Sequence, residues 1–364
     1  MTATIHAQDG TVTSPPPAKQ AKKPVDPRYI ALRNFAISIS AFNVFGYTML
    51  GFEQPWLFPL FAVLVGYSTD ITLETVSAWA YKRRPEYRGR GLRGLYQFLL
   101  PAHIGSLACN MLLYANNQFW PIMFGVMVTV AGKYVFRAPI NGKMRHFMNP
   151  SNLGISVCLL VFARWISISP PYMFSEWASS YFKLFIPIVI LVSGTVLNTM
   201  LTKRVALIVG WMGGFFIQAF VRHWLWGVQL NTALSVMTGI AFILFTNYMI
   251  TDPGTTPTRP RNQFMFGSMV AFVYAVLMQF NIVYTLFFAV CIVCGFRGLG
   301  HWVAYARRQR RTAEAGPEAT SAGDPTKEYD IPAGDGIVGN GNGSNGTAGN
   351  GNGGKVASGE TVTA

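Results

Sequence analysis

The chain has 364 residues, of which 51% are apolar and 12% are charged, and its formal net charge is +14. A soluble globular domain has about 25% charged residues, so this composition excludes an ordinary cytosolic enzyme, a disordered protein and a nucleic-acid-binding protein that uses a basic surface. Four cysteines in a chain of this length do not form a disulfide scaffold.

The composition divides the chain into three zones. Residues 1–33 form a polar, basic leader that lacks the pattern of a cleavable signal peptide. Residues 34–303 hold nearly all the apolar side chains, and residues 304–364 start with a basic stop and continue as a Gly- and Asn-rich tail. Because the leader and the tail have too few apolar residues to offset the entropy of ordering, we expect both to be disordered and cytoplasmic.

The apolar zone predicts an all-α integral membrane protein. A helix needs about 20 apolar residues to cross the hydrocarbon core of a bilayer. By that criterion the sequence contains about ten transmembrane helices, at residues 34–51, 55–81, 97–115, 118–137, 149–165, 181–200, 204–222, 231–250, 263–280 and 282–300.

The basic residues orient these helices. If both termini are cytoplasmic, the inner segments contain 24 Lys and Arg residues and the outer ends contain three, as the positive-inside rule predicts. The inner segments are the leader, residues 82–96, 133–148, 201–204 and 251–262, and the start of the C-terminal tail. This distribution explains the positive charge without a nucleic acid and indicates a bacterial cytoplasmic membrane, with the lipid bilayer as partner. The outer helix ends also hold an expected interfacial belt of Trp56, Trp120, Trp165, Trp177, Trp224 and Trp226.

Two carboxylates lie within the second predicted helix. Asp70 and Glu74 are four residues apart, so they share one helix face. Ionisable groups in a membrane helix suggest function, here a proton or cation site. Alternatively, this end of a long helix has left the hydrocarbon and pairs with the basic residues between Arg83 and Arg93. Both interpretations remain open.

Other polar or sulfur-containing residues favour structural roles. His103, in the third predicted helix, is most simply a hydrogen-bonded structural group. Cys291 and Cys294 form a C-x-x-C pattern inside an apolar helix, which favours small core residues over a redox pair. No cluster has the spacing of metal ligands, so no metal site is predicted.

Two predicted cytoplasmic segments contain the candidate binding residues. The first, residues 141–154, joins the fourth and fifth predicted helices, and the second, residues 251–261, follows the eighth. Basic and amide side chains before a helix N-terminus favour anion binding, whereas three prolines and four threonines indicate an extended loop rich in hydroxyl groups. The alternative is ordinary turn chemistry. The candidate cofactor-binding residues are Arg145, His146, Asn149, Pro150, Asn152, Gly154, Thr251, Asp252 and Thr255.

Together the two segments resemble a known family. Asn-Pro-x-x-x-Gly at 149–154, Thr-Asp-Pro at 251–253 and Phe266-Gly267 in the next predicted helix are similar to the NqrB/RnfD family, the membrane subunits of sodium-pumping NADH:quinone reductase and of the Rnf complex. The residue sequence of the second segment most resembles the UnbU-like branch of the family, which is linked to enediyne biosynthesis. The resemblance covers residues 30–300, and it implies ten helices with both termini inside.

The resemblance implies an electron-transferring flavoprotein. Family members attach FMN covalently at a [ST]-G-A-[TS] motif after the Asn-Pro helix, but the outer loop at 167–180 has no such motif, and the nearest fragment is Ser193-Gly194-Thr195. We therefore expect a non-covalent flavin, FMN or riboflavin, or a quinone, with the Asn149 and Thr251 loops at its cytoplasmic edge. The implied partners are other redox subunits or biosynthetic enzymes.

Two other functions fit the same sequence. A transporter or exporter would use the helices to bind a small molecule or an ion. A non-catalytic assembly subunit would recruit soluble enzymes through its basic cytoplasmic face. Whether the chain is itself an enzyme stays open. Its flavin content would discriminate between a transporter and an electron-transfer protein.

Overall fold

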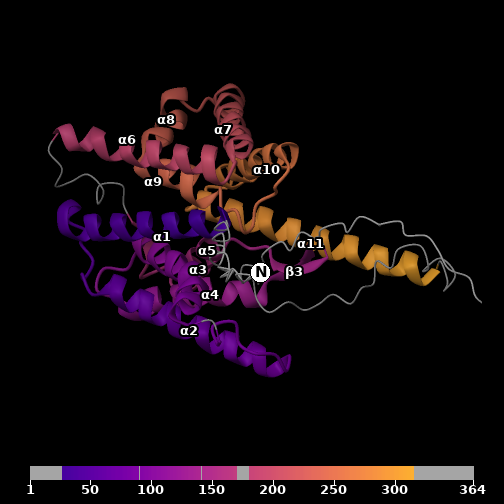
Figure 1. The fold of residues 1–364 in the computed structure, drawn as a ribbon. Helices are drawn as coiled ribbons and strands as arrows, with labels where there is room; N and C mark the ends of the chain where they lie inside the picture. The colour runs from indigo at the N-terminus through magenta and orange to yellow at the C-terminus, as the bar shows by residue number, and fades with distance from the viewer. Residues whose placement is uncertain (1–26, 90, 141, 170–179, 315–364) are drawn as a thin grey trace, which may run out of the picture.

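The computed structural model describes residues 27–314 except for residues 90, 141 and 170–179 (Figure 1). The described part is mostly helical, as expected. Its α-helices are α1 (Pro27–Phe45), α2 (Phe58–Ala80), α3 (Gly91–Leu112), α4 (Phe119–Val135), α5 (Pro150–Val161), α6 (Ser180–Val196), α7 (Val205–Trp226), α8 (Leu230–Ser235), α9 (Ile240–Leu244), α10 (Pro260–Gln279) and α11 (Thr285–Glu314). Shorter helical segments are η1 (Gly46–Leu50), η3 (Leu197–Leu201), η4 (Val236–Thr238) and η5 (Phe245–Met249).

Two short antiparallel ladders accompany the helices, so the all-α expectation is incomplete. Strand β1 (Leu113–Tyr114) pairs with β4 (Ser167–Ile168), and β2 (Arg137–Ile140) pairs with β3 (Lys143–His146). The second ladder forms because the chain reverses near Gly142, whose φ of 77° lies in the left-handed region that glycine adopts without strain. The two strands hydrogen-bond to each other, so backbone N–H and C=O groups between α4 and α5 find partners there.

The predicted zone boundaries at 33 and 303 both fall inside helices. Helix α1 begins at Pro27, within the predicted leader, and proline is favoured in the first turn because it needs no helical N–H partner. Helix α11 continues to Glu314, with Arg311 in its last turn, where a cation interacts favourably with the helix dipole. The predicted disorder of residues 1–26 and 315–364 lies outside the described residues.

The described residues do not confirm ten membrane-spanning helices. Two described helices are long and apolar enough to cross a membrane, α7 and Thr285–Thr312 of α11. Two consecutive helices from Leu230 to Met249, which meet at an angle of 64°, give a third candidate if they count as one span. Every one of the ten predicted ranges overlaps a described helix. However, α5 has 12 residues and is about 18 Å long, too short to cross about 30 Å of hydrocarbon.

The helices form two groups (Figure 1). Helices α2 to α5 lie on one side of α1 and helices α6 to α10 on the other, while α11 packs against α5 and β2 and extends past the rest. The closest crossing joins α7 and α10, where a Cβ on Gly267 would lie 2.2 Å from the carbonyl oxygen of Leu207. Glycine is required there because the two backbones touch.

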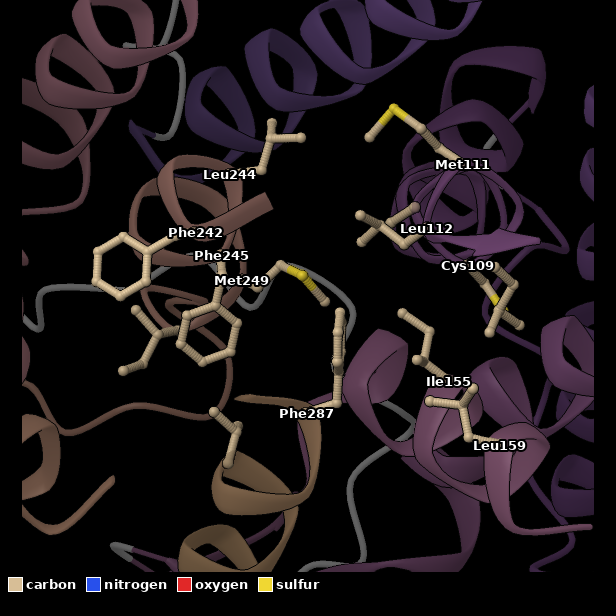
Figure 2. Packing of buried hydrophobic residues seen from close by; sticks show 14 of the residues in the cluster. Cys109, Met111, Leu112, Ile155, Leu159, Phe242, Leu244, Phe245, Met249 and Phe287 are labelled. Carbon is tan, nitrogen blue, oxygen red and sulfur yellow. The ribbon is translucent and has the colours of Figure 1, made fainter. Parts of the chain in front are cut away.

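A common apolar core joins the two groups. Figure 2 shows Met249 and Phe287 facing Leu112 and Ile155, which come from α3 and α5. All four side chains are buried. This core fixes the loop after η5 against the N-terminal helices, and so determines the position of the residues that follow Met249.

Candidate functional site

A cavity of about 400 Å³ runs between the two helix groups. This volume lies within the range of about 300–1,000 Å³ that is usual for small-molecule pockets. The α3 residues that line it extend from Gly94 to Leu112, which corresponds to about 27 Å along the helix at a rise of about 1.5 Å per residue. The cavity is therefore long and narrow.

One end of the cavity is polar, and four of the predicted cytoplasmic segments meet there. The segments at 82–96, 133–148, 201–204 and 251–262 each contribute lining residues, although they are far apart in sequence. The polar and charged side chains at this end include Glu86, Lys133, Arg137, His146, Thr202 and Asp252.

The other end of the cavity is apolar. Its walls come from helices α1, α3 and α9, which present aromatic and aliphatic side chains to it. They include Phe35, Ile39, Phe42, Ile104, Met111 and Leu244. Such a cavity suits a ligand with one polar and one apolar end.

Asn149 brings the two sequence motifs together. Its side-chain amide nitrogen donates to the carbonyl oxygen of Met249 at 2.8 Å. Its Oδ1 accepts from the backbone N–H of Asn152 and from the hydroxyl of Ser151, both at 3.1 Å, and so caps the N-terminus of α5. One buried side chain therefore satisfies a helix end and anchors the start of the Thr251 loop.

The loop after Met249 is held by its own side chains. The carboxylate of Asp252 accepts from the backbone N–H of Gly254 at 3.0 Å and from the Thr255 hydroxyl at 2.8 Å. The hydroxyl of Thr251 donates to the carbonyl oxygen of Asn247 at 2.7 Å. Local bonds of this kind replace helix or strand pairing in Asp- and Thr-rich turns.

Two arginines that were not among the predicted site residues also hold this loop. Arg204, which is 4% exposed, donates to the carbonyl oxygens of Pro253 and Pro257, and Arg297 donates to that of Thr255. In the sequence, both residues contribute to the positive charge of the inner segments. The sequence did contain a clue for Arg297, because it lies inside the tenth predicted span, where an ionisable group suggests a specific role.

The buried carboxylates of α2 are each paired with a cation. Asp70 is fully buried and accepts from Lys133 at 2.7 Å and from the Tyr134 hydroxyl at 2.6 Å. Glu74 is also fully buried and pairs with Arg83 at 2.5 Å, as the structural interpretation expected. The hydrogen bond from Arg83 to Glu74 raises the pKa of the guanidinium. Glu74 and Lys133 line the cavity.

The nine predicted cofactor-binding residues fall into two groups. Five line the cavity, namely His146, Asn149, Pro150, Thr251 and Asp252. The other four, Arg145, Asn152, Gly154 and Thr255, do not. Arg145 is exposed on the opposite face of the hairpin from His146, because side chains alternate along a strand.

Gly154 has a packing role. A Cβ at this position would lie 1.9 Å from the Thr129 hydroxyl and 2.4 Å from the carbonyl oxygen of Gly125. Helix α5 can therefore approach α4 only with glycine here. Asn152 is fully buried, and the hydroxyl of Thr255 donates to Asp252 as described above.

The remaining sequence candidates lie away from the cavity. His103 bonds to the hydroxyls of Ser40 at 2.7 Å and Tyr67 at 2.9 Å, a tie between helices α1, α2 and α3. Cys291 and Cys294 are free thiols, with Cys294 buried. Most of the outer loop examined for a covalent FMN motif lies outside the described residues.

Within the described ranges, no group of three His, Cys, Asp or Glu side chains could hold a metal ion. Comparison with protein-family models and with curated proteins finds no match to the chain. The inference of function therefore depends on the geometry of the cavity and on the two sequence motifs.

Proposed function

We propose that this chain is a multi-pass membrane redox subunit of the NqrB/RnfD type, which binds a flavin non-covalently in the cavity. The observation that carries the proposal is that both motif segments, around Asn149 and Thr251, line the polar end of one cavity with an apolar interior. Turn chemistry alone does not require two loops 100 residues apart to share a pocket.

The membrane location is supported by the outer faces of the helices. Large apolar side chains such as Leu64, Ile217 and Phe272 are more than half exposed. Soluble monomers rarely expose large contiguous apolar patches. Five of the six tryptophans assigned to the interfacial belt are exposed, while Trp177 lies outside the described residues.

The proposed topology has ten membrane segments with both termini inside. The convergence of four predicted inner segments at one end of the cavity supports it, because segments on the same side of a membrane can meet and segments on opposite sides cannot. A short helix such as α5 would then be one part of a segment buried among its neighbours.

The residues of the cavity suit a planar aromatic ligand with a polar edge. The rings of Phe35, Phe98 and Tyr134 can stack on such a ligand, and the side chains of Gln97 and Asn198 can hydrogen-bond to its edge. A bound flavin would supply one- and two-electron transfer. The apolar end would exclude water, and the polar end would give soluble or membrane-bound redox partners an approach from the cytoplasm.

The test is the absorption spectrum of detergent-purified protein before and after acid precipitation. Flavin bands that move into the supernatant would support a non-covalent flavoprotein. Bands that stay with the pellet would mean covalent attachment. A reproducibly colourless protein that takes up neither FMN nor riboflavin would overturn the proposal.

A transporter of small molecules is the second candidate. The length of the cavity favours this function, since the α3 residues that line the cavity extend from Gly94, near its polar end, to Leu112. Flavin-independent, substrate-dependent uptake into proteoliposomes would support this function over electron transfer.

A further inference from the structure

Arg137 is a preorganised cation at the polar end of the cavity. Its Nε donates to the carbonyl oxygen of Lys133 at 3.0 Å, and its guanidinium lies 5.7 Å from the ring centre of Tyr134. The indole of Trp302, on α11, donates to the carbonyl oxygen of Arg137 at 3.0 Å. These contacts hold both the backbone and the side chain of a residue that lines the cavity.

The terminal nitrogens of this guanidinium have no partner in the part of the chain that the structure describes. Among the described residues, no carboxylate lies within ion-pair distance of Arg137, and neither Nη1 nor Nη2 forms a hydrogen bond. The other contacts use only Nε and the face of the guanidinium, so both terminal nitrogens remain available in the fork geometry that binds a phosphate or a carboxylate.

The neighbouring carboxylates are already engaged. Asp70 pairs with Lys133, and Glu74 pairs with Arg83. Asp252 accepts from donors of its own loop. Glu86 also lines the cavity and is engaged elsewhere, and within the described ranges it forms no ion pair with Arg137. The positive charge of Arg137 is therefore not neutralised by the described part of the protein.

The hairpin places an imidazole beside this guanidinium. Arg137 and His146 are directly opposite each other in the β2–β3 ladder, and directly opposite residues project their side chains from the same face. Both line the cavity. Lys143 and Arg145 occupy the other face by strand alternation and are exposed.

We propose that Arg137 binds a phosphate group of the cavity's ligand. The ligand is then a phosphate monoester with an apolar or aromatic body. The identification of that body as a flavin rests on the proposed function, and in that case the cofactor is FMN and not riboflavin. A phospholipid monoester such as phosphatidic acid has the same headgroup chemistry and is the other source of such a group.

The experiment uses the full-length chain, purified in detergent and washed free of flavin. FMN, riboflavin and short-chain phosphatidic acid are titrated separately, with flavin fluorescence and calorimetry as readouts. The variants are Arg137→Gln and Arg137→Lys, with Lys143→Gln as the matched control on the opposite face of the same hairpin. Size-exclusion chromatography and thermal unfolding check that each variant is folded.

We expect wild type to bind FMN about 10- to 100-fold more tightly than riboflavin, the effect of a hydrogen bond to a charged group. Arg137→Gln loses this preference with riboflavin affinity unchanged, Arg137→Lys keeps part of it, and Lys143→Gln keeps all of it. The wild-type comparison needs no variant, so a misfolded Arg137→Gln protein does not prevent the test.

The other outcomes separate this inference from the proposed function. Equal binding of FMN and riboflavin by wild type leaves the flavoprotein proposal standing and overturns the phosphate subsite. If neither flavin binds, but phosphatidic acid binds in an Arg137-dependent way, the subsite is supported and the flavin function is overturned. Failure of all phosphate-bearing ligands, or binding that Arg137→Gln does not weaken, overturns the subsite.

Discussion

The amide nitrogen of Asn149 lies 2.8 Å from the carbonyl oxygen of Met249, and this hydrogen bond connects residues 100 positions apart. It ties the N-terminus of α5 to the end of η5, where the Thr251 loop starts. The polar end of the cavity depends on this connection, because both of its motif segments are positioned by it.

Replacing Asn149 separates its two roles. Asn149→Ala removes the helix cap, for about 1 kcal/mol, and leaves the buried Met249 carbonyl without its donor, for about 1–3 kcal/mol more. Asn149→Asp keeps an oxygen for the cap but loses the donor to Met249. We expect both variants to retain less flavin than wild type, and Asn149→Asp to unfold at a higher temperature than Asn149→Ala.

Thermal unfolding and the flavin-to-protein ratio measure these effects. Ser68→Ala is the control, since among the described residues the exposed Ser68 hydroxyl bonds only within its own helix and Ser68 does not line the cavity. Wild-type flavin content in Asn149→Asp would show that the bond to Met249 is not needed to form the site.

The two buried ion pairs give a second prediction. Lys133→Met leaves the fully buried Asp70 carboxylate without its cation, and breaking such a pair costs about 3–5 kcal/mol. Asp70→Asn combined with Lys133→Met removes both charges, so the double variant should be more stable than Lys133→Met alone. A double-mutant cycle of unfolding free energies measures the coupling.

The same cycle bears on the two interpretations of Asp70. If its role is structural, the double variant recovers flavin binding together with stability. If Asp70 carries protons or cations, the double variant is stable but inactive in a reconstituted electron-transfer or uptake assay. Additive effects of the two single substitutions would mean that the pair contributes no coupling.

The positions of the helices could be predicted largely from the sequence, because apolar runs of about 20 residues are a strong local pattern. The meeting of the Asn149 and Thr251 segments was expected only through the resemblance to a family. Their contact depends on one side-chain bond and on packing through Met249 and Phe287, and neither is visible in a local pattern.

The placement of two candidate residues, Arg145 and Gly154, could not be predicted from the sequence, for physical reasons. Strand alternation is not visible in a segment that the sequence predicts as a loop, whereas the two-stranded ladder turns Arg145 outward and Arg137 and His146 into the cavity. The motif suggests binding at Gly154, whereas in the structure α4 fills the space beside this residue. Both placements depend on which residues pair in the ladder and on which helices pack together, and a local sequence pattern shows neither.

Arg204 and Arg297, which donate to carbonyl oxygens of the Thr251 loop, give a third prediction. Arg204→Met and Arg297→Met each remove donors from carbonyl oxygens of the loop. The loop should then open more often, and trypsin should cut more rapidly after Arg261, at the start of α10. Arg307→Met, on the exposed part of α11, is the control. An unchanged cleavage rate in both test variants would contradict a clamping role.

The crossing of α7 and α10 gives the last prediction, with a control on the same helix. A Cβ at Gly210 would lie 2.3 Å from the carbonyl oxygen of Phe264, whereas a Cβ at Gly213 would have no heavy atom within 4 Å. Gly210→Ala must therefore separate two backbones, at a cost of about 1–3 kcal/mol or more. Gly213→Ala should be neutral or stabilising by up to about 1 kcal/mol, because alanine is the better helix former. Thermal unfolding of the two purified variants measures the difference. Equal unfolding temperatures would mean that the helices do not cross at Gly210.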